Sequence, residues 1–127
     1  MAREDIKYER ILVVEDNASN RRVVKMMLER LGYKADIASS GLEAIKALKE
    51  NHYDIVLMDI VMPEMDGLEA TREIRKLGQE GLKIIAITAY VVPGIMEMCL
   101  KVGMDDCITK PIRIKDLELA LERISHP

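Results

Sequence analysis

The stretch that decides the fold is Ile55-Val56-Leu57-Met58-Asp59, followed by the loop Ile60-Val61-Met62-Pro63-Glu64-Met65-Asp66-Gly67. Four apolar residues end at a carboxylate, and a loop with proline and glycine comes next. A short, continuous apolar run is typical of a strand that is buried on both faces of a parallel sheet. Open α/β sheets place their chemistry at the carboxyl ends of such strands. Asp59 is therefore the first candidate for a functional residue.

Similar apolar runs recur along the chain and alternate with helical patterns. The expected strands are 11–14, 34–38, 54–58, 83–88 and 106–109. Helical spacing is expected from the polar segment 17–20 to 31, after 40, from about 66 to 77, from 93 to about 102, and after 111. Regular alternation of this kind predicts an α/β fold, a doubly wound (βα)5 parallel sheet with helices on both faces. Right-handed crossovers favour the flavodoxin-like strand order 2-1-3-4-5.

Two of the expected helices carry more detailed predictions. In the second helix, Leu42, Ile45 and Leu48 are expected on one apolar face. The fourth helix is expected to begin at Pro93, because proline suits the first helical position, and to stop at Gly103.

Length and composition limit the functional classes. The 127 residues indicate a single domain over 1–127, with a core of about 10–124. A net charge of -3 argues against direct binding of nucleic acid or an anionic membrane. No apolar run approaches the roughly 20 residues of a membrane span, and 1–10 lacks a signal peptide, so we expect a cytoplasmic protein without membrane insertion. The two cysteines, Cys99 and Cys107, are expected to be reduced thiols.

Reactive or charged residues also follow three of the other strands. Glu15 and Asp16 follow the first strand, Thr88 ends the fourth, and Lys110 follows the fifth. In a parallel sheet these positions meet Asp59 at one edge. Three neighbouring carboxylates favour a bound cation, and Mg²⁺ prefers such oxygen ligands. An aspartate can also be a nucleophile that forms an aspartyl phosphate, with an ammonium and a hydroxyl to stabilise the transferred group.

Each of these residues also has an ordinary structural explanation. A strand-end carboxylate is often a solvated loop residue, threonine favours strands, and a lysine is commonly a surface ammonium. The combination of Glu15, Asp16 and Asp59 at the ends of two apolar strands favours a functional site. The Lys110–Pro111 bond is a candidate for the cis form, which would fix Lys110 in a tight turn.

Six segments, taken together and in order, resemble the receiver domain of two-component response regulators. They are Val14-Glu15-Asp16-Asn17, Leu57-Met58-Asp59-Ile60, Met62-Pro63-Glu64-Met65-Asp66-Gly67, Thr88-Ala89, Gly103-Met104-Asp105-Asp106 and Thr109-Lys110-Pro111. The resemblance runs from about residue 10 to residue 124. The sequences of the Asp59 and Lys110 segments are most similar to those of receivers of hybrid histidine kinases and of stand-alone regulators.

The resemblance implies that Asp59 takes a phosphoryl group from a phosphohistidine on a histidine kinase or a histidine phosphotransfer protein. It implies that Asp16, Asp59 and the Val61 carbonyl ligate Mg²⁺ or Mn²⁺, with Glu15 acting through water. Thr88 and Lys110 would bind the phosphoryl oxygens, and Thr88 would shift the surface of the fourth helix, fifth strand and fifth helix. Such a domain is a signalling switch in a phosphorelay, and promotes only its own phosphorylation and dephosphorylation.

The chain departs from the family pattern in two places. Cys107 stands where the family usually has an aromatic switch residue, while Tyr90 lies beside the expected phosphoryl site and could shield it from water, with surface packing as the alternative. Ile95, Met96 and Met98 cannot all face the core of one short helix. They indicate either a surface for a homodimer or an effector, or a rotated or irregular helix.

Three other functions compete with this interpretation. A phosphohydrolase with an aspartyl nucleophile would need a second acid shortly after Asp59 and a cap for its substrate. A flavodoxin-like cofactor carrier would need a phosphate-binding loop where Glu15 and Asp16 stand. A degenerate receiver that only docks partners would not need the full set of site residues.

Overall fold

Five parallel strands form the centre of the molecule, in the order β2-β1-β3-β4-β5. The structure is a computed structural model, and it describes residues 10–89 and 92–125. In chain order its elements are β1 (Arg10–Val14), α1 (Ala18–Arg30), β2 (Lys34–Ala38), α2 (Gly41–Glu50), β3 (Ile55–Asp59), α3 (Gly67–Arg75), β4 (Lys83–Thr88), α4 (Ile95–Val102), β5 (Asp106–Thr109) and α5 (Ile114–Ser125). The predicted fold class and strand order are confirmed.

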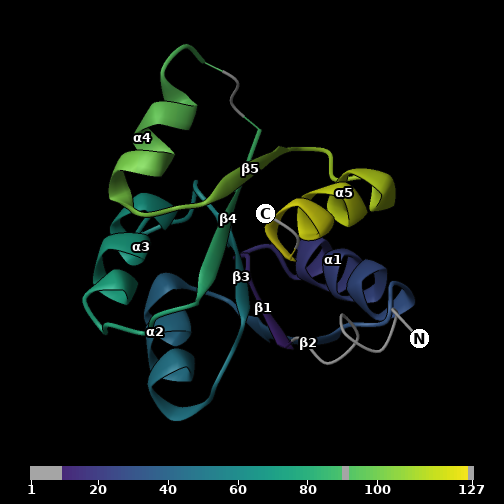
Figure 1. Ribbon diagram of the computed structural model, residues 1–127, viewed down its shortest axis with the longest axis horizontal. Coiled ribbons are helices and arrows are strands. Elements are labelled where there is room, and N and C mark those ends of the chain that lie inside the picture. The colour runs from purple at the N-terminus through teal and green to yellow at the C-terminus, as the bar shows by residue number, and fades with distance from the viewer. Residues whose placement is uncertain (1–9, 90–91, 126–127) are drawn as a thin grey trace.

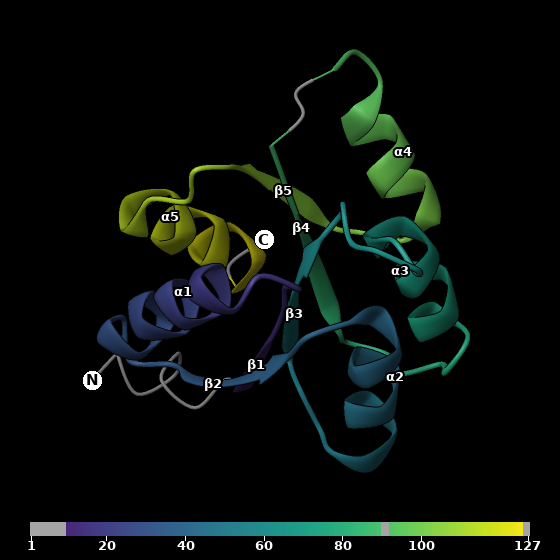
Figure 2. The same cartoon turned by 180° about the vertical axis from the view of Figure 1, so that it is seen from behind.

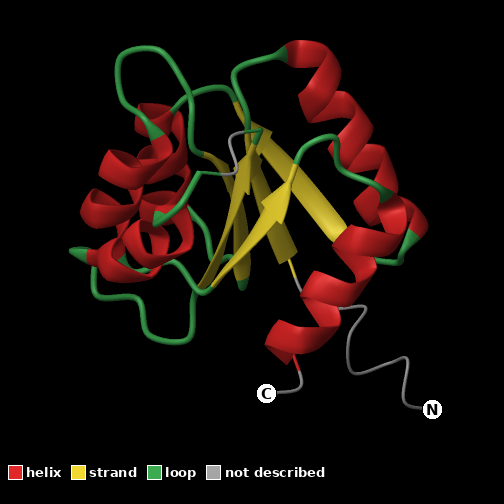
Figure 3. Ribbon diagram, turned by 90° about the horizontal axis from the view of Figure 1, so that it is seen from above, coloured by secondary structure: helices red, strands yellow, loops and turns green. Residues whose placement is uncertain are grey.

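Helices cover both faces of the sheet (Figure 1, Figure 2), with α1 and α5 on one face and α2, α3 and α4 on the other. Side chains alternate between the two layers along each strand: Val13 and Leu57 pack toward α1 and α5, whereas Leu12 and Met58 pack toward the other three helices. Figure 3 shows the sheet between its two helical layers. Because both faces are covered, the central strands are continuous apolar runs.

Three helices begin at a side chain that caps them. The side chains of Asn17, Ser40 and Asp66 each accept a hydrogen bond from the main-chain N–H three residues later, at 2.9, 3.1 and 2.8 Å. These bonds satisfy N–H groups that have no partner inside the helix. Each cap directly follows a strand or its loop, so the caps fix where the chain turns back. Within the described part of the chain, no helix is long and apolar enough to cross a membrane.

The predicted face of α2 is partly wrong. Leu42 is 60% exposed, and the buried residues of α2 are Gly41, Ala44 and Leu48. A Cβ on Gly41 would lie 2.9 Å from the Met65 sulfur. The small residues therefore define the buried face of α2, because they let the helix approach Met65, in the loop before α3, closely. The large Leu42 is turned outward.

The predicted start of α4 is also wrong. The helix begins at Ile95, and Pro93 lies in the preceding turn. Gly94 precedes the helix with φ = 86°, in the left-handed region that favours glycine. This conformation breaks the helical path between Pro93 and Ile95. Gly103 ends α4 as predicted, with φ = 109°.

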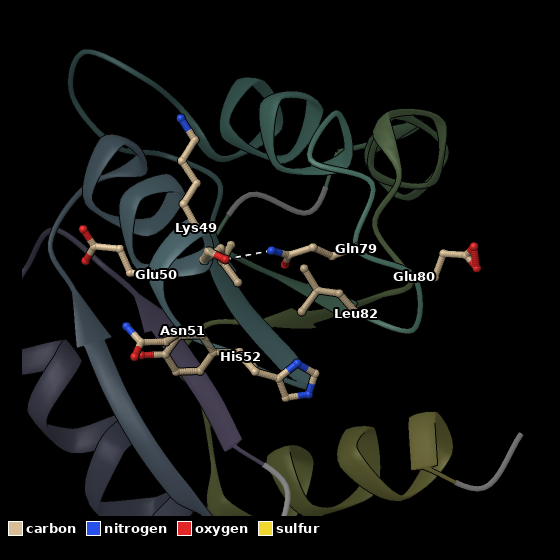
Figure 4. A pocket seen from close by; sticks show the side chains of 9 residues that line it. Lys49, Glu50, Asn51, His52, Gln79, Glu80 and Leu82 are labelled. Atoms are coloured by element: carbon tan, nitrogen blue, oxygen red, sulfur yellow. Dashed lines mark hydrogen bonds between the residues drawn. The ribbon is translucent and has the colours of Figure 1, made fainter.

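A polar hollow of about 390 Å³ lies near the amino ends of β3 and β4, at the opposite end of the strands from Asp59. Figure 4 shows that Lys49 and Glu50 of α2 and Gln79 of the loop before β4 are among its lining residues. The Gln79 amide donates a 2.7 Å hydrogen bond to the Leu48 carbonyl. The bond ties the loop before β4 to the last turn of α2, so we interpret this hollow as structural.

Candidate functional site

The carboxyl ends of four strands bring the predicted site residues to one edge of the sheet. Asp59 ends β3 and Thr88 ends β4, while Glu15 directly follows β1 and Lys110 directly follows β5. The Lys110 N–H donates a 2.8 Å hydrogen bond to the Thr88 carbonyl, which extends the pairing of β4 and β5 into the site. Thr88 is buried, with 2% of its surface exposed.

Glu15, Asp16 and Asp59 form an acidic cluster in which one oxygen of each lies within 4.8 Å of the others. Glu15 and Asp59 are buried, whereas Asp16 is exposed at the mouth of the site. Carboxylates at this separation repel one another unless a cation or a proton offsets their charge. Oxygen donors with one side open to solvent fit Mg²⁺, which keeps several of its own waters. The residues present therefore fit the predicted metal.

The Lys110 ammonium lies between two of these carboxylates. Its Nζ is 3.0 Å from Glu15 Oε1 and 3.1 Å from Asp59 Oδ2. Burial by itself would lower the pKa of Lys110, but the hydrogen bonds and attraction of Glu15 and Asp59 outweigh it and raise the pKa overall. The ammonium is therefore charged at neutral pH. The Lys110–Pro111 bond is cis, as hypothesised.

The second oxygen of Asp59 is held by the loop that follows β3. Val61 N–H donates a 3.2 Å hydrogen bond to Asp59 Oδ1. The side chain of Val61 is 52% exposed, so this residue enters the site through its main chain. The role of its carbonyl as a metal ligand stays a prediction.

Gly67 is a site residue that the sequence pattern showed only as part of a turn. Its N–H donates a 2.8 Å hydrogen bond to the Ile60 carbonyl. A Cβ on Gly67 would collide with the Asp59 carbonyl oxygen and would lie 2.8 Å from the Ile60 Cα. The first turn of α3 thus packs directly on the main chain of Asp59, and only glycine leaves room for it.

Arg21 is a second residue that sequence reasoning missed. Its Nη1 donates to the main-chain carbonyls of Glu15, at 2.8 Å, and of Asp16, at 3.1 Å. Asn17 completes the same loop, because its N–H donates a 3.1 Å hydrogen bond to Glu15 Oε2. Spacing from an apolar strand does not reveal such a contact, since it depends on the path of the loop between β1 and α1.

The sequence model of the response regulator receiver domain matches residues 11–122. The chain belongs to this family. Sensor histidine kinase RcsC of Escherichia coli K12 is 42% identical over 90% of this chain, and Histidine kinase 5 of Arabidopsis thaliana is 38% identical over 92%. This receiver chain spans only 12% and 16% of the lengths of those two relatives.

Solved structures agree with this assignment. The receiver domain of a sensor histidine kinase from Pseudomonas aeruginosa, with a magnesium ion coordinated in its active-site cleft, has a TM-score of 0.81 and 40% identity. The chemotaxis protein CheY4 of Vibrio cholerae has a TM-score of 0.88 and 27% identity. The alignments cover 92% of this chain and 98% of each of those chains.

Cys107, one of the residues at which this receiver departs from the family pattern, lies in β5 and is half-buried. Burial raises the pKa of its thiol to about 11, helped by the neighbouring Cys99 and Asp106. The two thiols are free and hydrogen-bond to each other. That they are reduced in the cell stays a prediction. Cys107 also lines a hollow of about 270 Å³ between β5 and α5.

Tyr90 lies outside the described residues, so its shielding role stays a prediction.

An apolar groove of about 400 Å³ opens beside the acidic cluster of the receiver. Its lining residues come from the site itself, from α1 and from the segment that follows β5: Glu15, Asn20, Val23, Val24, Ala89, Lys110, Pro111 and Ile112. Apolar surface therefore continues from the site residues onto α1. A partner that reaches Asp59 from this side would bury that surface.

Proposed function

We propose that this receiver domain stores a phosphoryl group on Asp59, taken from a phosphohistidine of a histidine kinase or a histidine phosphotransfer protein. The observation that supports this most directly is the position of Lys110. Asp59 is a buried aspartate at a strand end. It lies 3.1 Å from an ammonium and beside two more carboxylates, an arrangement that suits phosphoryl transfer better than packing. Family membership argues against the phosphohydrolase and flavodoxin-like alternatives.

In the proposed reaction an oxygen of Asp59 forms a bond to phosphorus as the phosphorus–nitrogen bond breaks. The electron pair of that bond stays with the histidine nitrogen, which takes up a proton. Negative charge is spread over the three phosphoryl oxygens during the transfer. Lys110 supplies a fixed positive charge for these oxygens, and the Thr88 hydroxyl a hydrogen-bond donor. Catalysis by this domain is limited to its own phosphorylation and dephosphorylation.

Glu15, Asp16 and Asp59 would hold the metal ion, with the Val61 carbonyl as a further ligand. Mg²⁺ bound there, or Mn²⁺ in its place, would supply positive charge that offsets the negative charge of the transferring group. Asp59 would serve as both ligand and nucleophile through its two oxygens. The hydrogen bond from Val61 N–H orients one of these oxygens.

The groove beside the site supports a protein as the phosphoryl donor. Its apolar lining from Val23, Val24 and Ile112 suits a helix that carries the phosphohistidine, because the donor must bring its imidazole to a nucleophile that is 2% exposed. The identity of the donor is a matter for experiment with candidate kinases and phosphotransfer proteins.

We also propose α4 as part of the surface through which the phosphorylated domain binds a second copy or an effector. Ile95 packs on the core, whereas Met96 and Met98 are 42% and 50% exposed. The irregular start of the helix and the exposed methionines therefore occur together. Phosphorylation would act on this surface by changing the charge beside Thr88, at the end of a strand that pairs with β5.

The test is the intact mass of the protein after incubation with acetyl phosphate or phosphoramidate, with and without Mg²⁺. We expect one phosphoryl adduct on the wild type in the presence of Mg²⁺, and none on Asp59→Asn. The substitution keeps the shape of the side chain and removes its nucleophilic charge. If no adduct forms under any condition, the domain is a docking module that does not accept phosphate, and partners of the unmodified protein should be sought.

A further inference from the structure

Arg21 holds both peptide groups that flank Asp16. The Glu15 carbonyl belongs to the peptide before Asp16, and the Asp16 carbonyl belongs to the peptide after it. Arg21 Nη1 donates to both, at 2.8 and 3.1 Å. The Arg21 main chain is itself anchored, since its N–H donates a 2.9 Å hydrogen bond to the Asn17 carbonyl in the first turn of α1.

The Asp16 carboxylate depends on this main-chain arrangement more than its neighbours do. Glu15 is held by Lys110 and by the Asn17 N–H, and Asp59 is held by Lys110 and by the loop after β3. In the described part of the chain no hydrogen bond holds the carboxylate of Asp16, which is exposed. Its position is therefore set by the peptides on either side of it.

We infer that Arg21 is a positioning residue for the metal site, which presents the Asp16 carboxylate to the ion by fixing the loop between β1 and α1. This inference rests on the proposed function, because it takes Asp16 to be a metal ligand. Mutation of groups that orient the ligands of a metal typically lowers metal affinity by roughly 10- to 100-fold.

The charge of Arg21 and its positioning role have opposite effects on Mg²⁺ affinity, so the two can be distinguished. A guanidinium near a cation site repels the cation, so removal of its charge alone would tighten Mg²⁺ binding. Loss of positioning would weaken Mg²⁺ binding instead. The two effects therefore oppose each other in Arg21→Gln, whereas Arg21→Lys keeps the charge and loses the planar donor group.

Arg22 provides the matched control. It follows Arg21 in α1 and is exposed, and its side chain points in a different direction because successive helical residues are about 100° apart. Arg22→Gln makes the same change of charge one residue away, without removing a hydrogen bond to the loop among the described residues.

The measurement is the dissociation constant of Mg²⁺ by isothermal titration calorimetry, for the wild type, Arg21→Gln, Arg21→Lys and Arg22→Gln. We expect about tenfold weaker binding in Arg21→Gln and a smaller loss in Arg21→Lys. Arg22→Gln should bind as tightly as the wild type or slightly more tightly. The rate of phosphorylation by phosphoramidate should return toward the wild-type value in Arg21→Gln at saturating Mg²⁺, since the loss is one of affinity.

The outcomes separate this inference from the proposed function. If the wild type binds no Mg²⁺, the proposed metal site itself is wrong. If the wild type binds Mg²⁺ and both Arg21 variants bind it equally or more tightly, Arg21 does not position Asp16. If Arg21→Gln does not fold, Arg21→Lys decides the question, because any loss of affinity in that variant occurs at constant charge.

Discussion

Lys110 is the counter-ion of Glu15 and Asp59. Two buried carboxylates without a partner would be costly, and the ammonium at 3.0 and 3.1 Å offsets their charge. The two contacts with Lys110 also hold both carboxylates in place at the edge of the sheet. At the scale of single residues, the site therefore depends on the balance between the Lys110 charge and the two carboxylate charges as well as on the positions of these side chains.

Gly67 shows how closely the site depends on the space that one residue leaves free. A Cβ at this position would collide with the Asp59 carbonyl oxygen, which is main chain and cannot turn away. We expect Gly67→Ala to lower the free energy of unfolding by about 3 kcal/mol, at the upper end of typical overpacking costs. Chemical denaturation followed by circular dichroism measures this change.

Gly78→Ala is the control for the Gly67 substitution. Gly78 has φ = 72° but no atom within 4 Å of its added Cβ, so alanine meets conformational strain without a collision. We expect a cost of about 1 kcal/mol, as for other left-handed positions. Equal costs for the two variants would show that the loop after β3 adjusts to the extra methyl group.

The site residues differ in how far the sequence could predict them. Asp59 and Thr88 end strands, and Glu15 and Lys110 directly follow strands, so apolar runs located all four. Arg21 and Gly67 were missed because each acts across a loop, through contacts with main-chain atoms. A charge pattern does not encode the path of a loop, and a glycine in a turn looks the same whether it supplies flexibility or space.

At the scale of elements, the apolar pattern located every strand and helix but not every face or boundary. In α2 the pattern favoured Leu42, whereas close packing of Gly41 on Met65 turned Leu42 outward. In α4 the pattern favoured a start at Pro93, whereas Gly94 adopts a left-handed conformation there. The periodicity of apolar residues predicts which side of a helix is hydrophobic, and it does not predict how closely the helix packs on its neighbours.

The exposed methionines of α4 lead to a prediction about association. Met96 is 42% exposed and makes little contribution to the core, so Met96→Glu should leave the free energy of unfolding within about 0.5 kcal/mol of the wild type. We expect it to weaken self-association or effector binding of the phosphorylated protein and to leave phosphorylation of Asp59 unchanged. Analytical ultracentrifugation, with and without phosphoramidate and Mg²⁺, measures the first effect.

Leu42→Glu is the matched control for Met96→Glu. Leu42 is 60% exposed on α2, away from the proposed surface, and receives the same new charge. Association that is weakened equally by both substitutions would point to a general effect of charge. Association that neither substitution weakens would exclude α4 as the contact surface.

At the scale of the whole molecule, the two ends of the sheet have separate polar clusters. At the end away from Asp59, Tyr53 donates a 2.6 Å hydrogen bond to Asp36, and Arg10 donates a 2.8 Å hydrogen bond to the same carboxylate. These residues join β1, β2 and the segment that precedes β3. The pairing of the strands is therefore stabilised independently of the functional end.

This second cluster predicts how stability depends on pH. Burial and the hydrogen bond to Asp36 raise the pKa of Tyr53 to about 12. Its contribution to stability is full below the unfolded pKa of about 10 and is lost as the pH rises toward 12. The hydrogen bond from Tyr53, and the Arg10 charge, lower the pKa of Asp36, whose contribution is present above about pH 4 and is lost as the pH falls.

Tyr53→Phe tests the alkaline half of this prediction. Between about pH 10 and 12 the wild type should lose unfolding free energy more steeply than the variant, because the variant has no phenol to titrate at this position. Urea unfolding at several pH values measures the difference in slope. Parallel curves would show that Tyr53 does not contribute to the loss at high pH.

The different surroundings of the two thiols make this domain suitable for attachment of a fluorescent reporter. Cys99 is fully buried, whereas Cys107 is half-buried in β5, with its thiol hydrogen-bonded to Cys99. A maleimide or iodoacetamide dye should therefore couple to Cys107 first, without any engineered cysteine, and fastest at alkaline pH because the thiol has a pKa of about 11. The dye would be attached to β5, which pairs with the strand that carries Thr88, in a chain that contains no tryptophan to interfere with its optical signal.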